Sequence, residues 1–353
     1  MLKTYILPLT ELIHETEDAA TLVFEQGLVD RISYYSGQYI TLKVMIDGET
    51  FYRSYSLSST PRLDRFLAIT IKRVKGGMVS NYVLDHFQAG RLVEFLAPAG
   101  NFYLETVTKN QRHVVLIGAG SGITPLMSMI RGVLFHEPQS TVSLIYANRK
   151  EEDIIFRERL TALSVKFPDR LFVQQILSQP ESPPSGNSLT GRINPTNVGS
   201  ILTPIVERSA LPASFWLCGP NGLMETVRQG LQQLGMSSSD IHQERFVADE
   251  EMQKKQTAGH GPTRMVRLIR ADKTIEIQVP YGTTVLEAAL AQGQDLPYSC
   301  KRGICSTCMA DLEDGKVEMD NPESLLPFEI EMGKVLVCQC HPLSDDVRIR
   351  IGG

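Results

Sequence analysis

The stretch CKRGICSTC, at residues 300–308, places three cysteines in one short loop, and Cys338 follows in a second, apolar stretch. Four residues separate Cys300 from Cys305, and two separate Cys305 from Cys308. Thiolates at this spacing are typical of plant-type [2Fe–2S] sites. The small residues between the cysteines suit a loop whose backbone N–H groups turn inward. The sequence therefore predicts an iron–sulfur cluster held by these four cysteines.

A zinc site and a pair of disulfides are the alternatives for these cysteines. Zinc favours two separated Cys-x2-Cys pairs, whereas this sequence has only one. Six cysteines, four of them at metal-binding spacing, fit a reducing compartment better than a disulfide framework. The last ligand, Cys338, lies in the apolar run 335–340, which we expect to be a strand.

The composition is that of an ordinary globular protein, with 353 residues, 42% hydrophobic and 21% charged, and a net charge of −5. Two or three domains are expected at this length. No stretch of the sequence is long and apolar enough to predict a membrane span. The first eight residues alternate like a strand and lack the apolar core of a signal peptide. We therefore expect a cytoplasmic protein.

The charge is uneven along the chain. Residues 262–353 carry ten lysines and arginines against fourteen aspartates and glutamates, while the remainder is nearly neutral. The sequence lacks a basic nucleic-acid footprint, so we expect no nucleic-acid partner. An acidic module can be steered toward a basic protein partner, although a merely soluble surface explains the same charge.

Residues 1 to about 105 contain short strand-like runs separated by turn signals, which predicts a small antiparallel barrel. In the stretch RSYSLSS at 53–59, strand alternation puts Arg53 and Tyr55 on one face and Ser54 and Ser56 on the other. Such a strand can offer a guanidinium to phosphate, a ring for stacking, and hydroxyls for the edge of a flat heterocycle.

A second stretch, KGGMVSNY at 75–82, leads into a helix-like segment. Its two glycines and Ser80 would let backbone N–H groups approach a pyrophosphate at the helix N-terminus. Taken alone, either this turn or the preceding strand is more often structural. Together, about twenty residues apart, they predict a site for a phosphorylated cofactor.

The middle of the chain alternates strands and helices, which predicts a parallel sheet with ligands at the carboxyl ends of its strands. A buried strand at 113–117 leads into a glycine turn at 118–122 and then a helix, which forms a phosphate cradle. Ile123 replaces the third small residue of the dinucleotide fingerprint, and the next strand ends in Asn148-Arg149-Lys150 rather than an acid. These departures argue against a simple Rossmann dehydrogenase.

Another strand ends in the turn Cys218-Gly219-Pro220. A lone cysteine before a turn is usually a small core filler. The polar residues 249–261 end in glycines and are expected to be a flexible linker.

The order of these motifs resembles the ferredoxin–NADP reductase superfamily with a plant-type ferredoxin at its C-terminus. The chain is most similar to reductase components of multicomponent oxygenases, of the phenylacetyl-CoA epoxidase and ketosteroid hydroxylase types. The resemblance implies a six-stranded antiparallel Greek-key β-barrel for flavin (1–106), an α/β parallel-sheet nucleotide domain (107–248), the linker (249–261), and a β-grasp ferredoxin domain (262–353).

The resemblance also implies a role for each matching residue. Hydride transfer is expected near Ser56, Thr124, Cys218 and Glu244, whereas Cys340 is expected to be a bystander. FAD is expected at Arg53, Ser54, Tyr55, Ser56, Lys72, Gly77, Met78, Val79, Ser80, Thr124 and Phe246. NAD(P)H is expected at Gly118, Gly120, Ser121, Gly122, Ile123, Thr124, Pro125, Arg149, Cys218, Gly219 and Pro220. FMN is the alternative flavin, because one branch of the family uses it.

The implied function is electron transfer from NAD(P)H through FAD to the [2Fe–2S] cluster and on to a partner oxygenase or hydroxylase. Flavin connects the two-electron donor NAD(P)H to one-electron acceptors, because it accepts a hydride and releases single electrons. The partner is expected to dock on the acidic ferredoxin domain, with the reductase monomeric when free. The alternatives are a redox-sensing subunit, and a reductase for a hybrid-cluster or desaturase partner.

Overall fold

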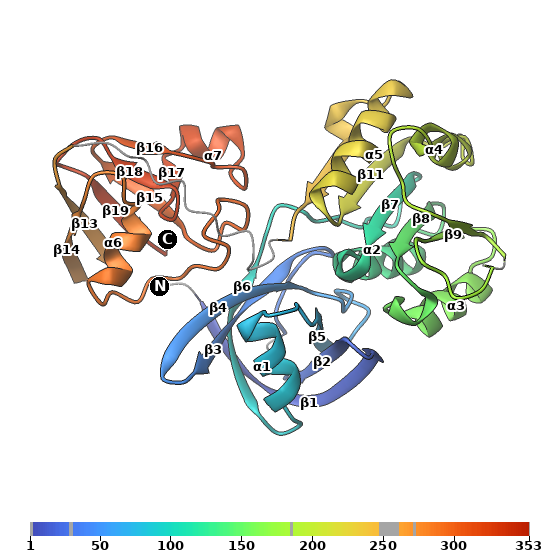
Figure 1. Ribbon diagram of the computed structural model, residues 1–353, viewed down its shortest axis with the longest axis horizontal. Helices are drawn as coiled ribbons and strands as arrows, with labels where there is room; N and C mark the ends of the chain where they lie inside the picture. Colours follow the sequence, from blue (N-terminus) through green and yellow to red (C-terminus); the bar gives the residue numbers. More distant parts are fainter. Residues whose placement is uncertain (1–2, 28–30, 184–185, 247–260, 271–272, 353) are drawn as a thin grey trace.

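The computed structural model describes residues 3–27, 31–183, 186–246, 261–270 and 273–352. These residues form three domains, with the N-terminal barrel between the nucleotide domain and the C-terminal domain (Figure 1). The expected linker, residues 249–261, lies outside the described residues except for Gly261.

The first domain is a six-stranded antiparallel sheet in the order β4-β3-β6-β1-β2-β5. A bridge between Leu57 and Ile69 joins the two edges of this sheet and closes the barrel. The β3–β4 hairpin turns at Asp47-Gly48, where both residues have positive φ, as an Asp-Gly hairpin turn requires. The elements are β1 (Thr4–Thr16), β2 (Ala19–Glu25), β3 (Tyr39–Ile46), β4 (Glu49–Ser56), β5 (Phe66–Lys72), α1 (Met78–His86) and β6 (Leu92–Ala99).

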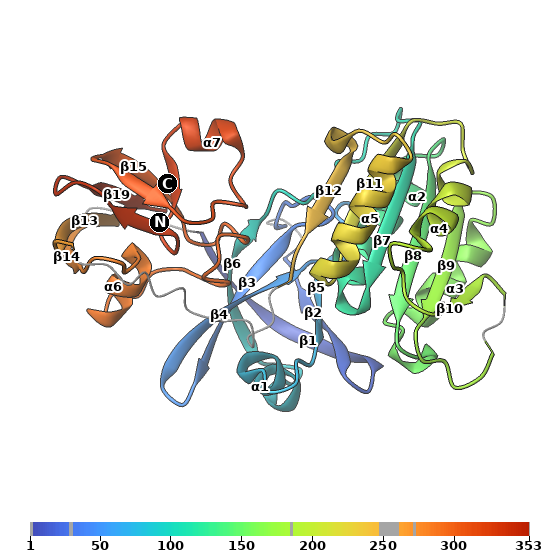
Figure 2. The same cartoon turned by 45° about the horizontal axis from the view of Figure 1, so that its top comes forward.

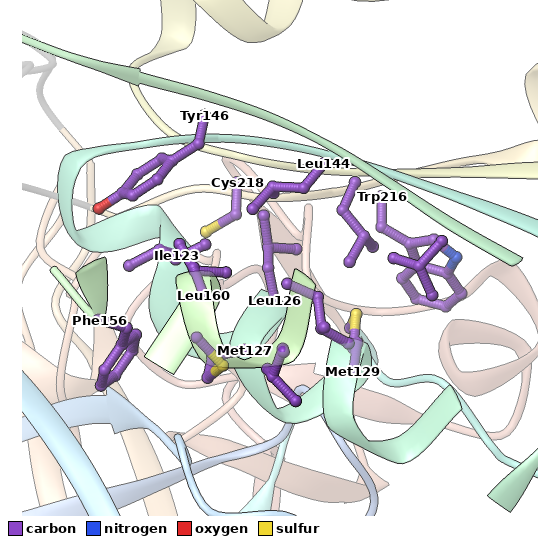
Figure 3. Close-up of a cluster of buried hydrophobic side chains, with 14 of the residues drawn as sticks. Ile123, Leu126, Met127, Met129, Leu144, Tyr146, Phe156, Leu160, Trp216 and Cys218 are labelled. Atoms are coloured by element: carbon purple, nitrogen blue, oxygen red, sulfur yellow. The ribbon is translucent and has the colours of Figure 1, made fainter. Parts of the chain in front are cut away.

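The second domain is a parallel sheet in the order β10-β9-β8-β7-β11-β12, covered by helices on both faces. Its central strands β7, β8 and β11 are mostly apolar because both faces of the sheet are covered. Figure 3 shows Leu126 of α2 beside Leu144 and Cys218 of the sheet. The elements are β7 (His113–Ala119), η1 (Gly120–Gly122), α2 (Ile123–His136), β8 (Thr141–Asn148), η2 (Glu151–Asp153), α3 (Arg157–Lys166), β9 (Leu171–Leu177), β10 (Ser188–Thr190), α4 (Val198–Val206), β11 (Ala213–Cys218), α5 (Asn221–Gln233), η3 (Ser238–Asp240) and β12 (Ile241–Glu244).

The third domain is a five-stranded sheet in the order β14-β13-β19-β15-β17, with α6 packed against it. Strands β13 and β19 are parallel and the other pairs are antiparallel. A capping box between Thr284 and Glu287 begins α6. The elements are β13 (Arg264–Arg270), β14 (Lys273–Val279), α6 (Val285–Ala291), β15 (Met309–Asp314), β16 (Val317–Met319), α7 (Pro327–Glu331), β17 (Lys334–Leu336), β18 (Cys340–Pro342) and β19 (Arg348–Ile351).

One expectation about this domain is wrong. The run 335–340 is not a single strand, because Cys338 lies in the turn between β17 and β18. A residue in a turn is released from the alternation of a strand, so its thiol can be aimed independently of the sheet faces. The apolar character of the run reflects burial of the turn rather than ladder pairing.

The barrel contacts both of its neighbours (Figures 1 and 2). Helix α2 packs on it through Ser128, whose hydroxyl donates to the carbonyl of Ser59 at 2.6 Å, and through an ion pair between Arg131 and Asp64. Strands β3 and β4 face the loop that carries the first three cysteines. Among the described residues, no helix is long and apolar enough to cross a membrane.

Candidate active site

A pocket of about 310 Å³ opens where the three domains meet. One wall comes from barrel strands β3 and β4, another from the end of β12, and the third from the cluster loop, which we define as residues 300–308. The lining residues are Tyr39, Phe51, Arg53, Ser54, Ser56, Glu244, Arg245, Phe246, Tyr298, Ser299, Cys300, Lys301, Ile304 and Cys305.

The RSYS strand contributes to this pocket from both of its faces. Arg53, Ser54 and Ser56 all line the pocket, because it lies at the open edge of the strand. Tyr55 packs against the hydrophobic core of the barrel. Lys72, at the end of β5, pairs with Ala19 across the sheet. The structure thus brings four of the expected flavin residues to this pocket, Arg53, Ser54, Ser56 and Phe246, and places Tyr55 and Lys72 elsewhere in the barrel.

Glu244 lies at the junction of the barrel and the nucleotide domain. In the parallel sheet, Cys218 pairs with Gly118 on one side and with Glu244 on the other. The hydroxyl of Ser56 donates to Oε2 of Glu244 at 3.2 Å. Burial raises the pKa of Glu244 to about 8. Its carboxyl is therefore largely protonated at neutral pH and can hold a proton beside the pocket.

The side chain of Cys218 and its backbone carbonyl lie in different surroundings. Its side chain is fully buried among the apolar residues under α2, as Figure 3 shows, and burial raises the pKa of its thiol. Its carbonyl oxygen faces the glycine turn, where a Cβ on Gly122 would lie only 2.0 Å away. The core-filling role and the position beside the turn therefore coincide.

The glycine turn connects β7 to α2 through the short helix η1. Gly120 adopts a φ of 52°, and Thr124 donates from Oγ1 to the carbonyl of Ser121 at 2.9 Å. No described side chain caps the first turn of α2, although the N–H of Ile123 already donates to the carbonyls of Gly120 and Ser121. The start of this helix presents the positive end of its dipole to an anion. The rest of the expected nucleotide set surrounds this turn: Ile123 and Pro125 begin α2, Gly219 and Pro220 precede α5, and Arg149 follows β8.

The second predicted phosphate site is the start of α1. Gly77 is the N-cap, and a Cβ there would lie 2.8 Å from the Val74 side chain. The buried hydroxyl of Ser80 accepts from the backbone N–H of Val74 at 3.1 Å, which fixes the turn. Val79 is buried and Met78 is exposed. This helix start is built from the residues that the sequence predicted for a pyrophosphate.

The four predicted cluster cysteines form two pairs, Cys300 with Cys305 and Cys308 with Cys338. Hydrogen bonding from Cys300 lowers the pKa of Cys305 to about 6, and hydrogen bonding from Cys308 lowers the pKa of Cys338. Within the described ranges, no three metal-binding side chains converge on a single ion. Two pairs suit two irons with two thiolates each, whereas zinc requires four ligands around one point.

The backbone of the cluster loop is shaped to surround such a group. Lys301, Gly303 and Ser306 all have positive φ. A Cβ on Gly303 would lie 1.6 Å from the carbonyl oxygen of Asn321, so only glycine fits there. The N–H of Arg302 donates to Sγ of Cys300 at 3.3 Å. This inward-turned amide is what the small loop residues led us to expect.

Three family models match the chain in succession. The oxidoreductase FAD-binding domain matches residues 7–103, the oxidoreductase NAD-binding domain 116–229, and the 2Fe-2S iron-sulfur cluster binding domain 269–343. The chain is 35% identical to one of the subunits of the 1,2-phenylacetyl-CoA epoxidase of Escherichia coli (strain K12), over 94% of this chain and 93% of that protein. It is 34% identical to the ferredoxin reductase component of 3-ketosteroid-9-alpha-monooxygenase of Rhodococcus rhodochrous, over 98% and 97%.

The chain belongs to the family of oxygenase reductase components. The solved structure of phthalate dioxygenase reductase matches its fold with a TM-score of 0.61 and 21% identity, over 99% of this chain and 98% of that chain. The predicted fold class, family and cofactors (FAD, NAD(P)H and a [2Fe–2S] cluster) are thereby confirmed. This oxygenase reductase component is an NAD(P)H oxidoreductase that acts in electron transfer.

Several pocket residues of the oxygenase reductase component escaped the sequence analysis. Tyr39, Phe51 and Tyr298 line the pocket, yet no local motif marks them. Tyr39 lies opposite Ser56 in the β3–β4 pairing, and the register of that hairpin could have identified it. Nζ of Lys301 lies 4.5 Å from the centre of the Tyr298 ring, a contact between the cluster loop and a residue just before it. Their positions follow from how the domains dock.

Proposed function

We propose that this chain accepts hydride from NAD(P)H at the three-domain pocket and delivers single electrons, through the cluster loop, to a partner oxygenase or hydroxylase. The observation that carries this proposal is the lining of one pocket by three domains. Ser56 comes from the flavin-domain strand, Glu244 from the edge of the nucleotide sheet, and Cys305 from the cluster loop. This convergence supports assigning the three functions to one shared pocket.

The hydride-transfer locus is assigned to Ser56, Thr124, Cys218 and Glu244. Ser56 and Glu244 are joined by a hydrogen bond in the pocket. Thr124 orders the glycine turn by donating to the Ser121 carbonyl, and Cys218 sets the spacing between that turn and β12. Glu244 holds a proton at neutral pH because of its burial. These residues therefore shape the site where the nicotinamide and flavin rings would meet and keep a proton beside it.

FAD, when bound, accepts a hydride and releases its two electrons one at a time. Arg53 and Ser54 line the pocket and are assigned to flavin binding. The N-terminus of α1, with Gly77 as its N-cap, is assigned to the pyrophosphate. Phe246 lines the opposite wall and would enclose the ring. A pyrophosphate site separate from the pocket favours FAD over FMN.

The four cysteines are assigned as the ligands of the cluster, two to each iron. All-cysteine plant-type clusters have potentials near about −400 mV, low enough to reduce most metal-centre acceptors. The loop contributes amide donors to the sulfurs, such as the N–H of Arg302, and such donors tune the potential. The acidic ferredoxin domain is assigned as the docking surface for a basic acceptor protein.

The proposal is tested by spectroscopy and kinetics on the purified full-length protein. We expect flavin and iron–sulfur absorbance, with iron and sulfide bound in equal amounts. NADH or NADPH should reduce the flavin and drive reduction of cytochrome c, and comparing kcat/KM for the two nucleotides identifies the donor. Colourless protein, or coloured protein that neither nucleotide reduces, would contradict the proposal. A redox-sensing subunit would bind both groups without turning over.

A further inference from the structure

The peptide unit between Cys305 and Ser306 is held at both ends by side-chain hydrogen bonds. The hydroxyl of Tyr39, on barrel strand β3, donates to the carbonyl oxygen of Cys305. The N–H of Ser306 donates to Oγ of Ser324 at 3.0 Å. The carbonyl of Ser324 accepts from Nδ2 of Asn101 in the barrel at 3.2 Å. The barrel thus holds one ligand's backbone directly through Tyr39 and indirectly through Ser324.

This peptide unit has an uncommon conformation. Ser306 has a φ of 41°, in the left-handed region that side-chain-bearing residues rarely adopt. Such a conformation persists only where the surroundings hold it. The two hydrogen bonds at the ends of the peptide supply that restraint. The Thr307 hydroxyl also donates to the Cys305 carbonyl, at 3.3 Å, so loss of the Tyr39 bond would leave that carbonyl held only from within the cluster loop.

Tyr39 also belongs to the flavin pocket. It is 5% exposed, lines the pocket together with Cys305, and pairs with Ser56 across the β3–β4 hairpin. The barrel leaves room for its ring at Gly100, where a Cβ would lie 2.8 Å from a ring carbon. One side chain therefore extends from the wall of the flavin pocket to the backbone of a cluster ligand.

We propose that Tyr39 is a positioning residue for electron transfer from the flavin pocket to the cluster, because its hydroxyl fixes the Cys305 backbone against the pocket wall. This inference rests on the proposed function. In the step it serves, one electron from reduced flavin converts one ferric ion of the cluster to ferrous. No covalent bond forms or breaks, and Tyr39 keeps its proton.

A second set of contacts supports the same docking. The hydroxyls of Thr41 and Ser54 lie 3.3 Å and 3.4 Å from that of Thr307, and the backbone N–H of Ser54 donates to Oγ of Ser299 at 3.0 Å. Each of these contacts ends on a side-chain hydroxyl of Ser299 or Thr307, which can rotate to tolerate small shifts. The Tyr39 contact differs because it acts on the backbone of a ligand itself.

The test compares Tyr39→Phe with Tyr34→Phe in the fully loaded protein. Tyr34 is the matched control, since it is a buried barrel tyrosine whose hydroxyl lies 2.7 Å from Oγ of Ser59. Stopped-flow absorbance measures, in one trace, the rates of flavin reduction and of cluster reduction. We expect the ratio of the cluster rate to the flavin rate to fall about fivefold in Tyr39→Phe, as one lost hydrogen bond implies. Tyr34→Phe should keep the wild-type ratio.

Hydrogen exchange provides a readout that does not depend on turnover. Peptides covering the cluster loop and Ser324 should exchange faster in Tyr39→Phe, while those covering β1 and β2 keep wild-type rates. An unchanged ratio of the two rates, or faster exchange throughout the barrel, would overturn the inference. Asn101→Ala, which removes the indirect restraint, should loosen the same peptides if Tyr39→Phe does not fold, and wild-type exchange in it would overturn the inference as well.

The two proposals fail in different ways. Wild-type protein in which neither nucleotide reduces flavin or cluster would reject the proposed function. Wild-type protein that reduces both, alongside a Tyr39→Phe variant indistinguishable from it, would reject only the positioning role.

Discussion

The hydroxyl of Ser56 lies 3.2 Å from Oε2 of Glu244, and this hydrogen bond joins the flavin-domain strand to the edge of the nucleotide sheet. The two residues are far apart in the sequence and belong to different domains. Because Glu244 pairs with Cys218, and Cys218 with Gly118, the contact ties the barrel to the glycine turn. A change in the charge of Glu244 should therefore affect the junction between the two domains, where the nicotinamide and flavin rings would meet.

Glu244 should make stability depend on pH. Its pKa is raised by burial from 4.5 to about 8 in the folded protein, so between these values the native state holds a proton that the unfolded chain has released. This stabilisation is complete below pH 4.5 and is lost as the pH rises toward 8. Glu244→Gln should match wild type near pH 5 and melt at least about 2–4 °C higher above pH 8, because each pKa unit corresponds to about 1.4 kcal/mol and about 1 kcal/mol already shifts the Tm of a domain of about 150–250 residues by that much.

Thermal denaturation of the flavin-free protein across pH 5–9 provides this comparison. Glu94→Gln is the control, since Glu94 is a partly exposed glutamate of the neighbouring barrel that pairs with Lys43 at the surface. Parallel Tm curves for wild type and Glu244→Gln would contradict the assigned titration.

The sequence predicted what depends on local spacing. Cys300, Cys305 and Cys308 lie in one loop, so their intervals alone indicate the cluster, and the glycine turn follows its strand directly. Tyr39 was missed because its contact with Cys305 arises only when two domains dock. Nothing in the local sequence around either residue encodes that approach.

The position of Cys338 shows a second limit. An apolar run predicts burial, but burial is common to strands and to turns packed beneath them. The structure places this ligand in a turn, where its thiol can meet that of Cys308. Similarly, Tyr55 obeys strand alternation, yet packing against the barrel core, rather than alternation alone, decides its environment.

Gly122→Ala should impair nucleotide binding. A Cβ at this position would lie 2.0 Å from the Cys218 carbonyl oxygen, and neither backbone turn can yield without displacing the other. We expect KM for NAD(P)H to rise at least about tenfold, equivalent to about 1.4 kcal/mol. Steady-state kinetics with ferricyanide as the acceptor measure this.

Gly199→Ala is the matched control for that substitution. Gly199 lies in α4, and a Cβ there meets nothing within 4 Å. Alanine is a better helix former than glycine, so the control should be neutral or slightly stabilising. Wild-type KM in Gly122→Ala would show that the two turns do not constrain the nucleotide site.

Cys305→Ser should separate the two halves of electron transfer. The substitution removes a thiolate from the pair with Cys300, so we expect cytochrome c reduction to fall at least about tenfold. Reduction of the flavin by NAD(P)H should largely persist. Electron paramagnetic resonance of the dithionite-reduced protein and iron analysis report the state of the cluster.

Cys340→Ala tests whether the remaining buried cysteine of this domain matters. Its side chain is fully buried in the hydrophobic core of the domain, where it serves as a small apolar filler. We expect a normal cluster signal with reduced thermal stability. Loss of the cluster in this variant would contradict the assigned ligands. Loss of flavin reduction in a folded Cys305→Ser protein would instead contradict the assigned division of electron transfer between flavin and cluster.

Asp64→Ala should weaken the junction between the barrel and the nucleotide domain. Asp64 is 7% exposed, pairs with Arg131 of α2 at 2.5 Å and 2.7 Å, and accepts from the N–H of Thr60 at 2.7 Å. Removing it leaves a largely buried guanidinium without its carboxylate, which should cost about 2–3 kcal/mol.

Asp85→Ala is the control, because Asp85 pairs with Arg73 on the surface and is 49% exposed, so its loss should have little measurable effect. Thermal release of the flavin, followed by its fluorescence, should occur at a lower temperature in Asp64→Ala than in wild type or Asp85→Ala. Equal midpoints in the two variants would mean that the apolar contacts of α2, rather than this ion pair, hold the domains together.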